Sequence, residues 1–223
     1  MKLQVNGNSI EYETAGPRTG IPLVLIHGFP FSREMWKYQV DALKQDYYVV
    51  TYDVRGHGGS DPGDGQYTME LLVDDLVALL DHLHLRAVVG VGLSMGGYIL
   101  LRAIERHPDR FRGIVLCDTR SEADGNEGKI KRARQVAELK KNGMGGFSEN
   151  FLKAVFHEKT LAEKPDVVGS IRSVIARTSP LAVAGTLIAI AGRTDSTPSL
   201  FRIAVPALVI VGRHDAGTPP SAS

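Results

Sequence analysis

The sequence is short of the features that mark several classes of protein. It has one cysteine among 223 residues, Cys117, which excludes a disulfide bond within the chain, and the apolar run around it favours a buried structural thiol. Its 26 basic and 25 acidic side chains give a net charge of +1, too little basic excess to indicate a nucleic acid or an acidic lipid as partner. No apolar run approaches the roughly 18 residues of a membrane span, and the N-terminus lacks a secretory signal. We therefore expect a cytoplasmic protein with a small-molecule partner and no association with membranes.

What the sequence does contain is an alternation of strand-like and helix-like patterns. Residues 2–14 alternate apolar and polar side chains around Asn6-Gly7, which predicts an antiparallel hairpin. An apolar stripe over 69–83, behind Thr68 as a candidate N-cap, predicts a helix. Continuous apolar runs are typical of strands buried in a parallel sheet, and they lie at 23–26, 48–50, 88–91, 114–116 and 207–211. The order predicts an α/β fold with a mostly parallel, doubly wound sheet, whose catalytic loops gather at the carboxyl ends of the strands.

Residues 121–195 interrupt this alternation, because they carry helical patterns and no strand-like run. We predict a first core segment at 1–120, an inserted helical cap at 121–195 and a second core segment at 196–223. Basic residues gather early in the predicted cap and would suit either an anionic site or, as we favour, a solvated helix face. They are Lys129, Lys131, Arg132 and Arg134.

A Gly-Leu-Ser-Met-Gly pentapeptide at residues 92–96 stands between an apolar strand and a helical pattern. In this setting a G-x-S-x-G motif places its serine on a sharp, strained turn, and the glycines leave room for that turn. The helix that follows points its N-terminal N–H groups at the site, where negative charge develops on the substrate. The pattern predicts Ser94 as a nucleophile rather than as part of a structural turn.

Neither a cofactor nor a metal is expected at this site. Gly90 and Gly92 resemble the start of a dinucleotide-binding G-x-G-x-x-G motif, but its third glycine would fall on Met95. The frame therefore fails, and no nicotinamide cofactor is implied. His82 and His84 are spaced to point apart on a helix, which argues against a pair of metal ligands.

An oxyanion hole needs two backbone N–H donors, and the sequence offers a candidate for each. The first is the N–H of Met95, the residue after the nucleophile. The second comes from a loop after an earlier strand, where Gly28 permits close approach and Pro30 has no N–H, which leaves Phe29. We expect His27, which precedes this loop, to brace it rather than to act as a base.

The carboxylate partner of a serine nucleophile should follow it in the chain, at the end of a later strand. Asp215 stands just past the last apolar run and is our prediction for the group that orients an imidazole. Asp118, at the end of the preceding predicted strand, is the alternative.

These motifs, in this order, resemble the α/β-hydrolase superfamily over essentially the whole chain. The resemblance rests on the His27-Gly28 loop, the Asp-Val-Arg-Gly-His-Gly-Gly-Ser segment at 53–60, the Ser94 turn and the Asp215 turn. Among its members the chain looks most like the small esterases and the 3-oxoadipate enol-lactonase-like enzymes. Haloalkane dehalogenases and epoxide hydrolases carry aspartate in place of Ser94, so those reactions are disfavoured. The resemblance implies acyl transfer to serine followed by hydrolysis.

The resemblance also implies a catalytic histidine beyond a further strand and helix after Asp215, and the chain ends at Ser223. His57, His157 and His214 are weak alternatives as the base. We therefore expect a truncated or incompletely represented hydrolase that is inactive or weak in this form. The strand at 207–211 would then be a bare apolar edge, open to self-association or strand exchange.

The sequence as a whole predicts a serine esterase or lactonase for small, fairly apolar substrates. Besides Phe29, the candidate pocket residues are Phe147, Phe151 and Phe156, although phenylalanines at helical spacing are more often core. Two alternatives stay open: a non-catalytic binding or scaffold protein with the same fold, and a perhydrolase or carbon–carbon bond hydrolase that uses the same serine.

Overall fold

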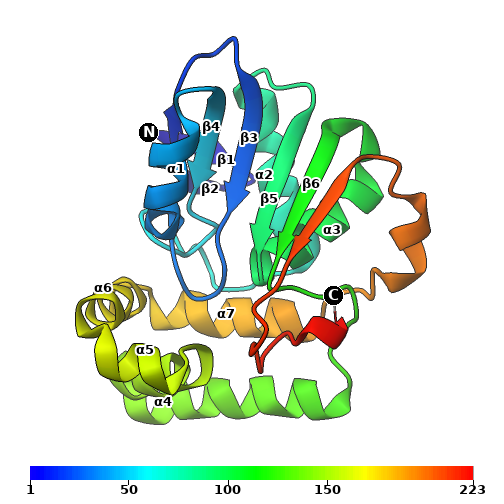
Figure 1. Ribbon diagram of the computed structural model, residues 1–223. Coiled ribbons are helices and arrows are strands. Elements are labelled where there is room, and N and C mark those ends of the chain that lie inside the picture. The colour runs from blue at the N-terminus through cyan, green and yellow to red at the C-terminus, as the bar shows by residue number, and fades with distance from the viewer. Residues whose placement is uncertain (223) are drawn as a thin grey trace.

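A seven-stranded sheet runs through the protein in the computed structural model, which describes residues 1–222. The strands are β1 (Lys2–Val5), β2 (Asn8–Ala15), β3 (Ile21–Ile26), β4 (Tyr47–Tyr52), β5 (Val88–Leu93), β6 (Phe111–Cys117) and β7 (Ala207–Ile210). Their order in the sheet is β1-β2-β4-β3-β5-β6-β7 (Figure 1). The pairs β1–β2 and β2–β4 are antiparallel, and the pairs from β4–β3 to β6–β7 are parallel. The predicted α/β fold with a mostly parallel sheet is confirmed.

The N-terminal hairpin forms where the sequence predicts it. Residues of β1 pair antiparallel with β2, from Lys2 opposite Glu11 to Val5 opposite Asn8. Asn6 and Gly7 make the turn with φ angles of 45° and 72°. Glycine and asparagine reach this left-handed region at little cost, so the turn and its register follow from this dipeptide.

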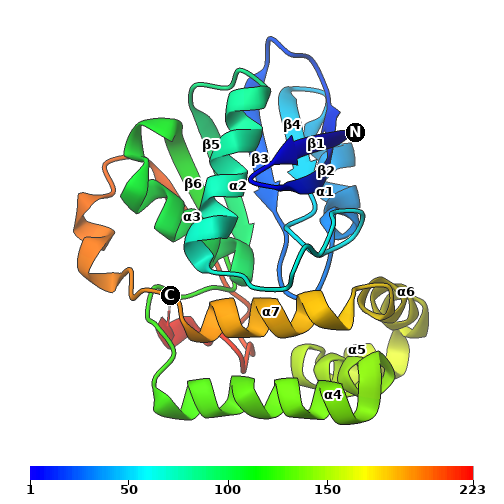
Figure 2. The same ribbon diagram turned by 180° about the vertical axis from the view of Figure 1, so that it is seen from behind.

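Helices cover the two faces of the sheet unequally. The helices α2 (Met69–His82) and α3 (Met95–Arg106) lie against one face, whereas α1 (Lys37–Leu43) lies against the other (Figures 1 and 2). The predicted N-cap of α2 is confirmed, because the Thr68 hydroxyl accepts the Leu71 N–H at 3.1 Å. Short 3-10 turns complete the core connections, at Arg33–Trp36, Pro108–Arg110, Thr197–Arg202 and Pro220–Ala222.

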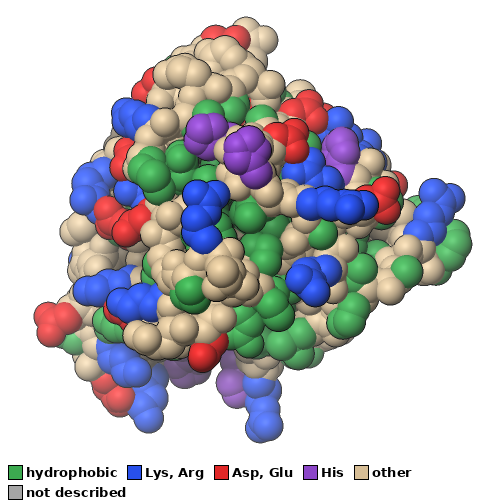
Figure 3. All heavy atoms as spheres, turned by 90° about the horizontal axis from the view of Figure 1, so that it is seen from above, with side chains coloured by type: hydrophobic (Ala, Val, Ile, Leu, Met, Phe, Trp, Pro, Cys, Tyr) green, Lys and Arg blue, Asp and Glu red, His purple; other side chains and the backbone are tan. Residues whose placement is uncertain are grey.

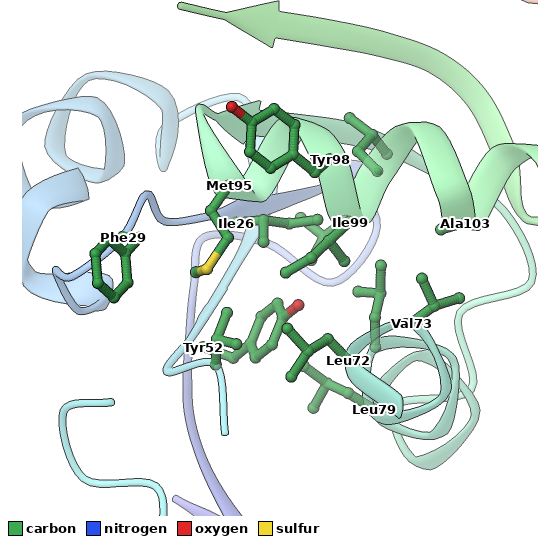
Figure 4. Packing of buried hydrophobic residues seen from close by; sticks show 14 of the residues in the cluster. Ile26, Phe29, Tyr52, Leu72, Val73, Leu79, Met95, Tyr98, Ile99 and Ala103 are labelled. Carbon is green, nitrogen blue, oxygen red and sulfur yellow. The ribbon is translucent and has the colours of Figure 1, made fainter. Parts of the chain in front are cut away.

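The larger hydrophobic core lies between the sheet and the pair α2 and α3. Leu72 and Leu79 of α2 point toward Tyr52 of β4 and Ile99 of α3 in Figure 4, and all four side chains are almost completely buried. A smaller cluster on the opposite face packs Trp36 against alternate residues of the central strands. Alternate residues therefore point to opposite faces, as expected for strands buried on both sides.

Four helices lie across the edge of the sheet at which the parallel strands end (Figures 1 and 2). They are α4 (Asn126–Val155), α5 (Glu158–Glu163), α6 (Pro165–Ala176) and α7 (Pro180–Ala191). Gly143 breaks the regular helix inside α4, with a φ of 66°. Lys129, Lys131 and Arg134 are exposed on α4 and Arg132 pairs with Asp124 at 3.2 Å, which fits the solvated helix face that we favoured.

The two connections between these helices and the sheet are tied to each other. The Ser196 N–H donates to the Ser121 carbonyl at 2.9 Å, and the Arg193 guanidinium pairs with Asp124 at 2.9 Å. The same guanidinium lies over the ring of Tyr98 in α3, 4.2 Å from its centre. These contacts thus hold the connection from β6 to α4 against the connection from α7 to β7.

The strand β7 forms one edge of the sheet and is poorly covered. Leu208, Val209 and Ile210 are 55%, 49% and 50% exposed, so the predicted apolar edge is confirmed, although the strand ends at Ile210 rather than at 211. Seen from above, hydrophobic side chains form a broad group across the lower half of the molecule (Figure 3).

Within residues 1–222 no single helix is long and apolar enough to cross a bilayer, although the bent pair α6 and α7 would pass such a test together.

Candidate active site

Ser94 occupies a strained turn between β5 and α3. Its φ and ψ angles are 49° and −110°, a combination that costs a non-glycine residue about 1–3 kcal/mol. The glycines on either side are required by close backbone contacts. A Cβ atom on Gly92 would lie 2.4 Å from the Gly96 carbonyl oxygen, and one on Gly96 would lie 2.2 Å from that of Ile26. The structure therefore places Ser94 on the sharp elbow that the pentapeptide predicts.

The elbow is held by a residue that sequence reasoning did not identify. The Thr119 hydroxyl donates to the Ser94 carbonyl at 2.8 Å, and the Ser94 N–H donates to the Cys117 carbonyl at 2.9 Å. Gly97 leaves room for Thr119, since a Cβ atom there would lie 2.4 Å from the threonine oxygen. The Ser94 side chain itself is half-buried, and its hydroxyl makes no hydrogen bond to any other residue between 1 and 222.

The loop that carries Phe29 lies beside this elbow. A Cβ atom on Gly28 would lie 3.3 Å from the Leu93 carbonyl oxygen, directly before Ser94. Figure 4 shows the Met95 side chain on the side of α3 that faces Phe29, and both belong to one buried cluster. The Phe29 N–H has no acceptor among the described residues, and a cis peptide bond joins Phe29 to Pro30. The structure thus brings the loop of Phe29 close to Ser94 and Met95, and the two N–H groups as oxyanion donors stay a prediction.

His27 is a brace, as predicted, and not a base. Its Nδ1–H donates to the Gly28 carbonyl at 2.9 Å, and its Nε2 accepts the Val54 N–H at 2.9 Å. Complete burial lowers the pKa of His27 to about 4, although the bond to Gly28 opposes this shift. Because both ring nitrogens are occupied in the neutral form, His27 has no free nitrogen with which to accept a proton from Ser94.

Asp215 lies in the turn after β7 and is held as a carboxylate. Its Oδ1 accepts the N–H groups of Gly217 and Thr218 at 2.7 and 2.9 Å, and its Oδ2 accepts the Thr218 hydroxyl at 2.8 Å. Partial burial by itself would raise the pKa of Asp215, but the hydrogen bonds from Thr218 and Gly217 outweigh it and hold the pKa below its usual value.

Asp118, the alternative acid, lies next to Asp215 at the ends of adjacent strands. Its Oδ1 accepts the Gly212 N–H at 2.8 Å, and its backbone φ is 41°. A Cβ atom on Gly212 would lie 3.7 Å from Asp118 Oδ1 and 3.8 Å from Asp215 Cβ. Cys117, one residue earlier, is half-buried rather than buried, and desolvation together with Asp118 raises the pKa of its thiol. The structure therefore brings both candidate carboxylates to one place.

Within the described residues none of the seven histidines makes a hydrogen bond to the Ser94 hydroxyl. His57 is buried, its Nδ1 bonds to the Arg55 carbonyl at 3.1 Å, and desolvation lowers its pKa to about 3. His82 is the last residue of α2, and His84 lies just beyond that helix. His107 follows α3, whose 12 residues separate it from Ser94 by about 18 Å. His157 and His214 face each other instead, with ring centres 6.3 Å apart.

The predicted pocket phenylalanines form an aromatic cluster on Phe29. The rings of Phe147 and Phe151 from α4 are stacked on each other, and each meets the edge of Phe29 with centres 6.0 Å apart. Phe147 is 6% exposed, and Phe156 packs at the margin of the same core. These side chains therefore join the cap helices to the loop of Phe29, and a role in contacting substrate stays a prediction.

Known proteins that are similar to this chain share most of its length. The family profile described as alpha/beta hydrolase fold matches residues 21–223. The chain is 29% identical to 3-oxoadipate enol-lactonase 2 of Acinetobacter baylyi over 207 residues, which are 93% of this chain and 76% of that enzyme.

Solved structures resemble the fold closely. A thermophilic esterase from Thermogutta terrifontis has a TM-score of 0.92 at 37% identity, covering 99% of this chain and 81% of the esterase. The enol-lactonase from Burkholderia xenovorans has a TM-score of 0.93 at 32% identity, covering 100% of this chain and 85% of that enzyme. With the family profile matched from residue 21 onward, this chain belongs to the α/β-hydrolase fold family.

Proposed function

We propose that this protein is a serine hydrolase that cleaves small carboxylic esters or lactones through an acyl-enzyme on Ser94. The observation that carries the proposal is the strained Ser94 elbow, placed beside a loop whose Phe29 N–H has no acceptor within residues 1–222. Strain of this kind persists where the surroundings over-determine it, and it concentrates at active sites. The esterase and the enol-lactonases that the chain resembles act on this substrate class by their names, which supports the proposal.

In the proposed reaction the Ser94 oxygen attacks the substrate carbonyl while its proton passes to an imidazole. The oxyanion of the tetrahedral intermediate accepts hydrogen bonds from the N–H groups of Phe29 and Met95. The carbon–oxygen bond to the leaving alcohol then breaks, and the imidazolium returns its proton to that alcohol. Water attacks the acyl-enzyme by the same route and releases the acid and Ser94. Asp215, with Asp118 beside it as the alternative, orients the imidazole and stabilises its charged form.

The imidazole is the part of this site that the described histidines do not provide. We therefore propose that the 223-residue chain is a weak hydrolase, and that a histidine on a further strand and helix completes the site. The exposed apolar edge at β7 supports this proposal, since a further strand would cover it. Removal of a triad member in serine hydrolases lowers kcat by up to about a millionfold, which sets the scale of the loss.

The test compares this chain with a version extended through the expected strand and histidine, on short nitrophenyl esters and an enol-lactone. We expect the extension to raise kcat by about 10³-fold or more, and Ser94→Ala to abolish the gain. Turnover that survives Ser94→Ala would sink the acyl-enzyme. Turnover by the 223-residue chain as fast as that of the extended version would sink the missing histidine.

A non-catalytic binding protein is the second candidate, and the observation that favours it is the absence of an imidazole at Ser94 among the described residues. A fluorophosphonate probe separates the two functions, because it labels only an activated serine. Labelling of Ser94 in the extended version supports the hydrolase, whereas retained affinity for a small ester without labelling supports a binding protein. The division into a core at 1–120 and 196–223 with a cap at 121–195, and a cytoplasmic location, are also proposals.

A further inference from the structure

The segment 53–60 follows β4 and is one of the motifs that give the chain its family resemblance. It has no role in the proposed reaction, although it is among the most completely buried polar parts of the protein. Asp53 and His57 are 0% exposed. Two of its glycines lie directly against neighbouring carboxylates. A Cβ atom on Gly58 would lie 2.3 Å from the Asp53 carboxyl, and one on Gly59 would lie 1.8 Å from an oxygen of Glu11. The segment is therefore shaped around buried carboxylates.

The Asp53 carboxylate reaches from this segment to the loop of Phe29. The backbone N–H of Arg33 donates to its Oδ1 at 2.7 Å, and the N–H of Gly59 donates to its Oδ2 at 2.8 Å. The Arg33 guanidinium pairs with the same carboxylate and donates to Glu11 at 2.8 Å. Burial raises the pKa of Asp53, whereas these hydrogen bonds and the Arg33 charge oppose the shift. A buried carboxylate that meets so many donors fixes the backbone of Arg33 in place.

The other end of the Phe29 loop is fixed from the same segment. The Val54 N–H donates to His27 Nε2, and the His27 ring in turn donates to the Gly28 carbonyl. Phe29 thus lies between two attachments to one rigid turn, one before it at Gly28 and one after it at Arg33. The ring of His57, from the same turn, also meets Phe29, with centres 6.2 Å apart.

We propose that Arg33 and Asp53 are positioning residues for the oxyanion hole: the turn at 53–60 holds the loop of residues 28–33 at both ends, so that the Phe29 N–H points at the substrate oxygen. The proposal rests on the hydrolase function proposed above. Donor position matters because an oxyanion stabilises the reaction only where donors lie at about 2.7–3.1 Å from the position that it will occupy.

The test is Arg33→Met in the extended version of the chain, with Arg55→Met in the same version as the control. The Arg55–Asp75 pair, at 2.8 Å, is likewise an arginine–aspartate ion pair of this turn and is more buried than Arg33, but it joins the turn to α2 and not to the Phe29 loop. We expect Arg33→Met to lower kcat about tenfold with KM nearly unchanged, since a displaced donor costs less than the 10²–10³-fold of a deleted one. Hydrogen exchange at the amides of residues 28–33 should rise in Arg33→Met alone. Arg33→Lys keeps the charge. It should therefore restore part of the kcat and part of the protection from hydrogen exchange that Arg33→Met loses.

The outcomes separate this inference from the proposed function. If Arg33→Met does not fold, Glu11→Gln removes the negative charge beside the guanidinium but keeps an acceptor oxygen, and it is scored in the same way. Unchanged kcat and unchanged exchange at residues 28–33 overturn the positioning role. A rate of the extended version no higher than that of its Ser94→Ala variant overturns the proposed function, whereas the exchange measurement still decides whether Arg33 holds the loop.

Discussion

His27 and His57 are held as neutral imidazoles inside the protein, and this makes its stability depend on pH. Desolvation lowers their pKa values to about 4 and about 3, whereas an unfolded histidine titrates near 6.5. Between about pH 6.5 and 4 the unfolded chain therefore binds more protons than the folded one. The contribution of these residues is fully present above about pH 6.5 and is lost as the pH falls, by about 3 kcal/mol for His27 at pH 4.

Urea unfolding at several pH values measures this loss, with His27→Gln as the comparison. The variant has one fewer buried imidazole, so the slope of its free energy of unfolding between pH 6.5 and 4 should be clearly shallower than that of the wild type. Equal slopes would mean that His27 is protonated in the folded protein, and its bond with the Val54 N–H could not then exist.

The sequence predicts the residues of the site better than their partners. Ser94, Phe29, Met95 and Asp215 are predicted from local patterns, because a strand, a turn and a helix in series place Ser94 and Met95, and strand ends place Phe29 and Asp215. Their roles stay predictions. Thr119 and Arg33 are not predicted in this way, because each acts through a residue at least 20 positions away along the chain, on a neighbouring strand end or loop. Only the paired strands bring those residues together.

At the scale of elements, the helix α7 makes direct backbone contact with the loop before α2. A Cβ atom on Gly185 would lie 2.3 Å from the Gly65 carbonyl oxygen, and the Tyr67 ring would lie 3.0 Å away. We expect Gly185→Ala to lower the free energy of unfolding by about 1–3 kcal/mol, because backbone must move to admit the methyl group. Gly169→Ala in α6 is the control. Nothing lies within 4 Å of its Cβ position, so it should gain up to about 1 kcal/mol in helix propensity.

Thermal unfolding of the two variants decides between contact and propensity. A gain in melting temperature for both would mean that α7 sits farther from the loop at Gly65 than the structure places it. The same pair explains a limit of sequence reasoning at this scale. The helical pattern after residue 121 was recognised, but the sequence does not distinguish a glycine that weakens a helix from one that lets a helix approach backbone.

At the scale of the whole molecule, the helices α4 to α7 contact the rest of the protein in two places. One is near Ser94, and the other is where the chain enters and leaves these helices. Near the site, Phe147 and Phe151 pack on Phe29. At the connections, Arg193 pairs with Asp124. Movement of these helices would therefore displace the loop that carries Phe29, the proposed oxyanion donor. The edge strand β7 has no such cover. We expect the protein to contact other molecules through this strand.

An edge strand with unpaired backbone groups and apolar side chains is a template for another strand. We expect the 223-residue chain to self-associate through β7, so that its weight-average mass in sedimentation velocity rises with concentration. Val209→Lys should raise the dissociation constant by at least about tenfold, since pairing two edges would then bring two ammonium groups together. Phe201→Lys is the control, because Phe201 is 81% exposed on the turn Thr197–Arg202 and outside the strand. A mass that stays monomeric at every concentration, or falls equally in both variants, would show that β7 is not the surface of contact.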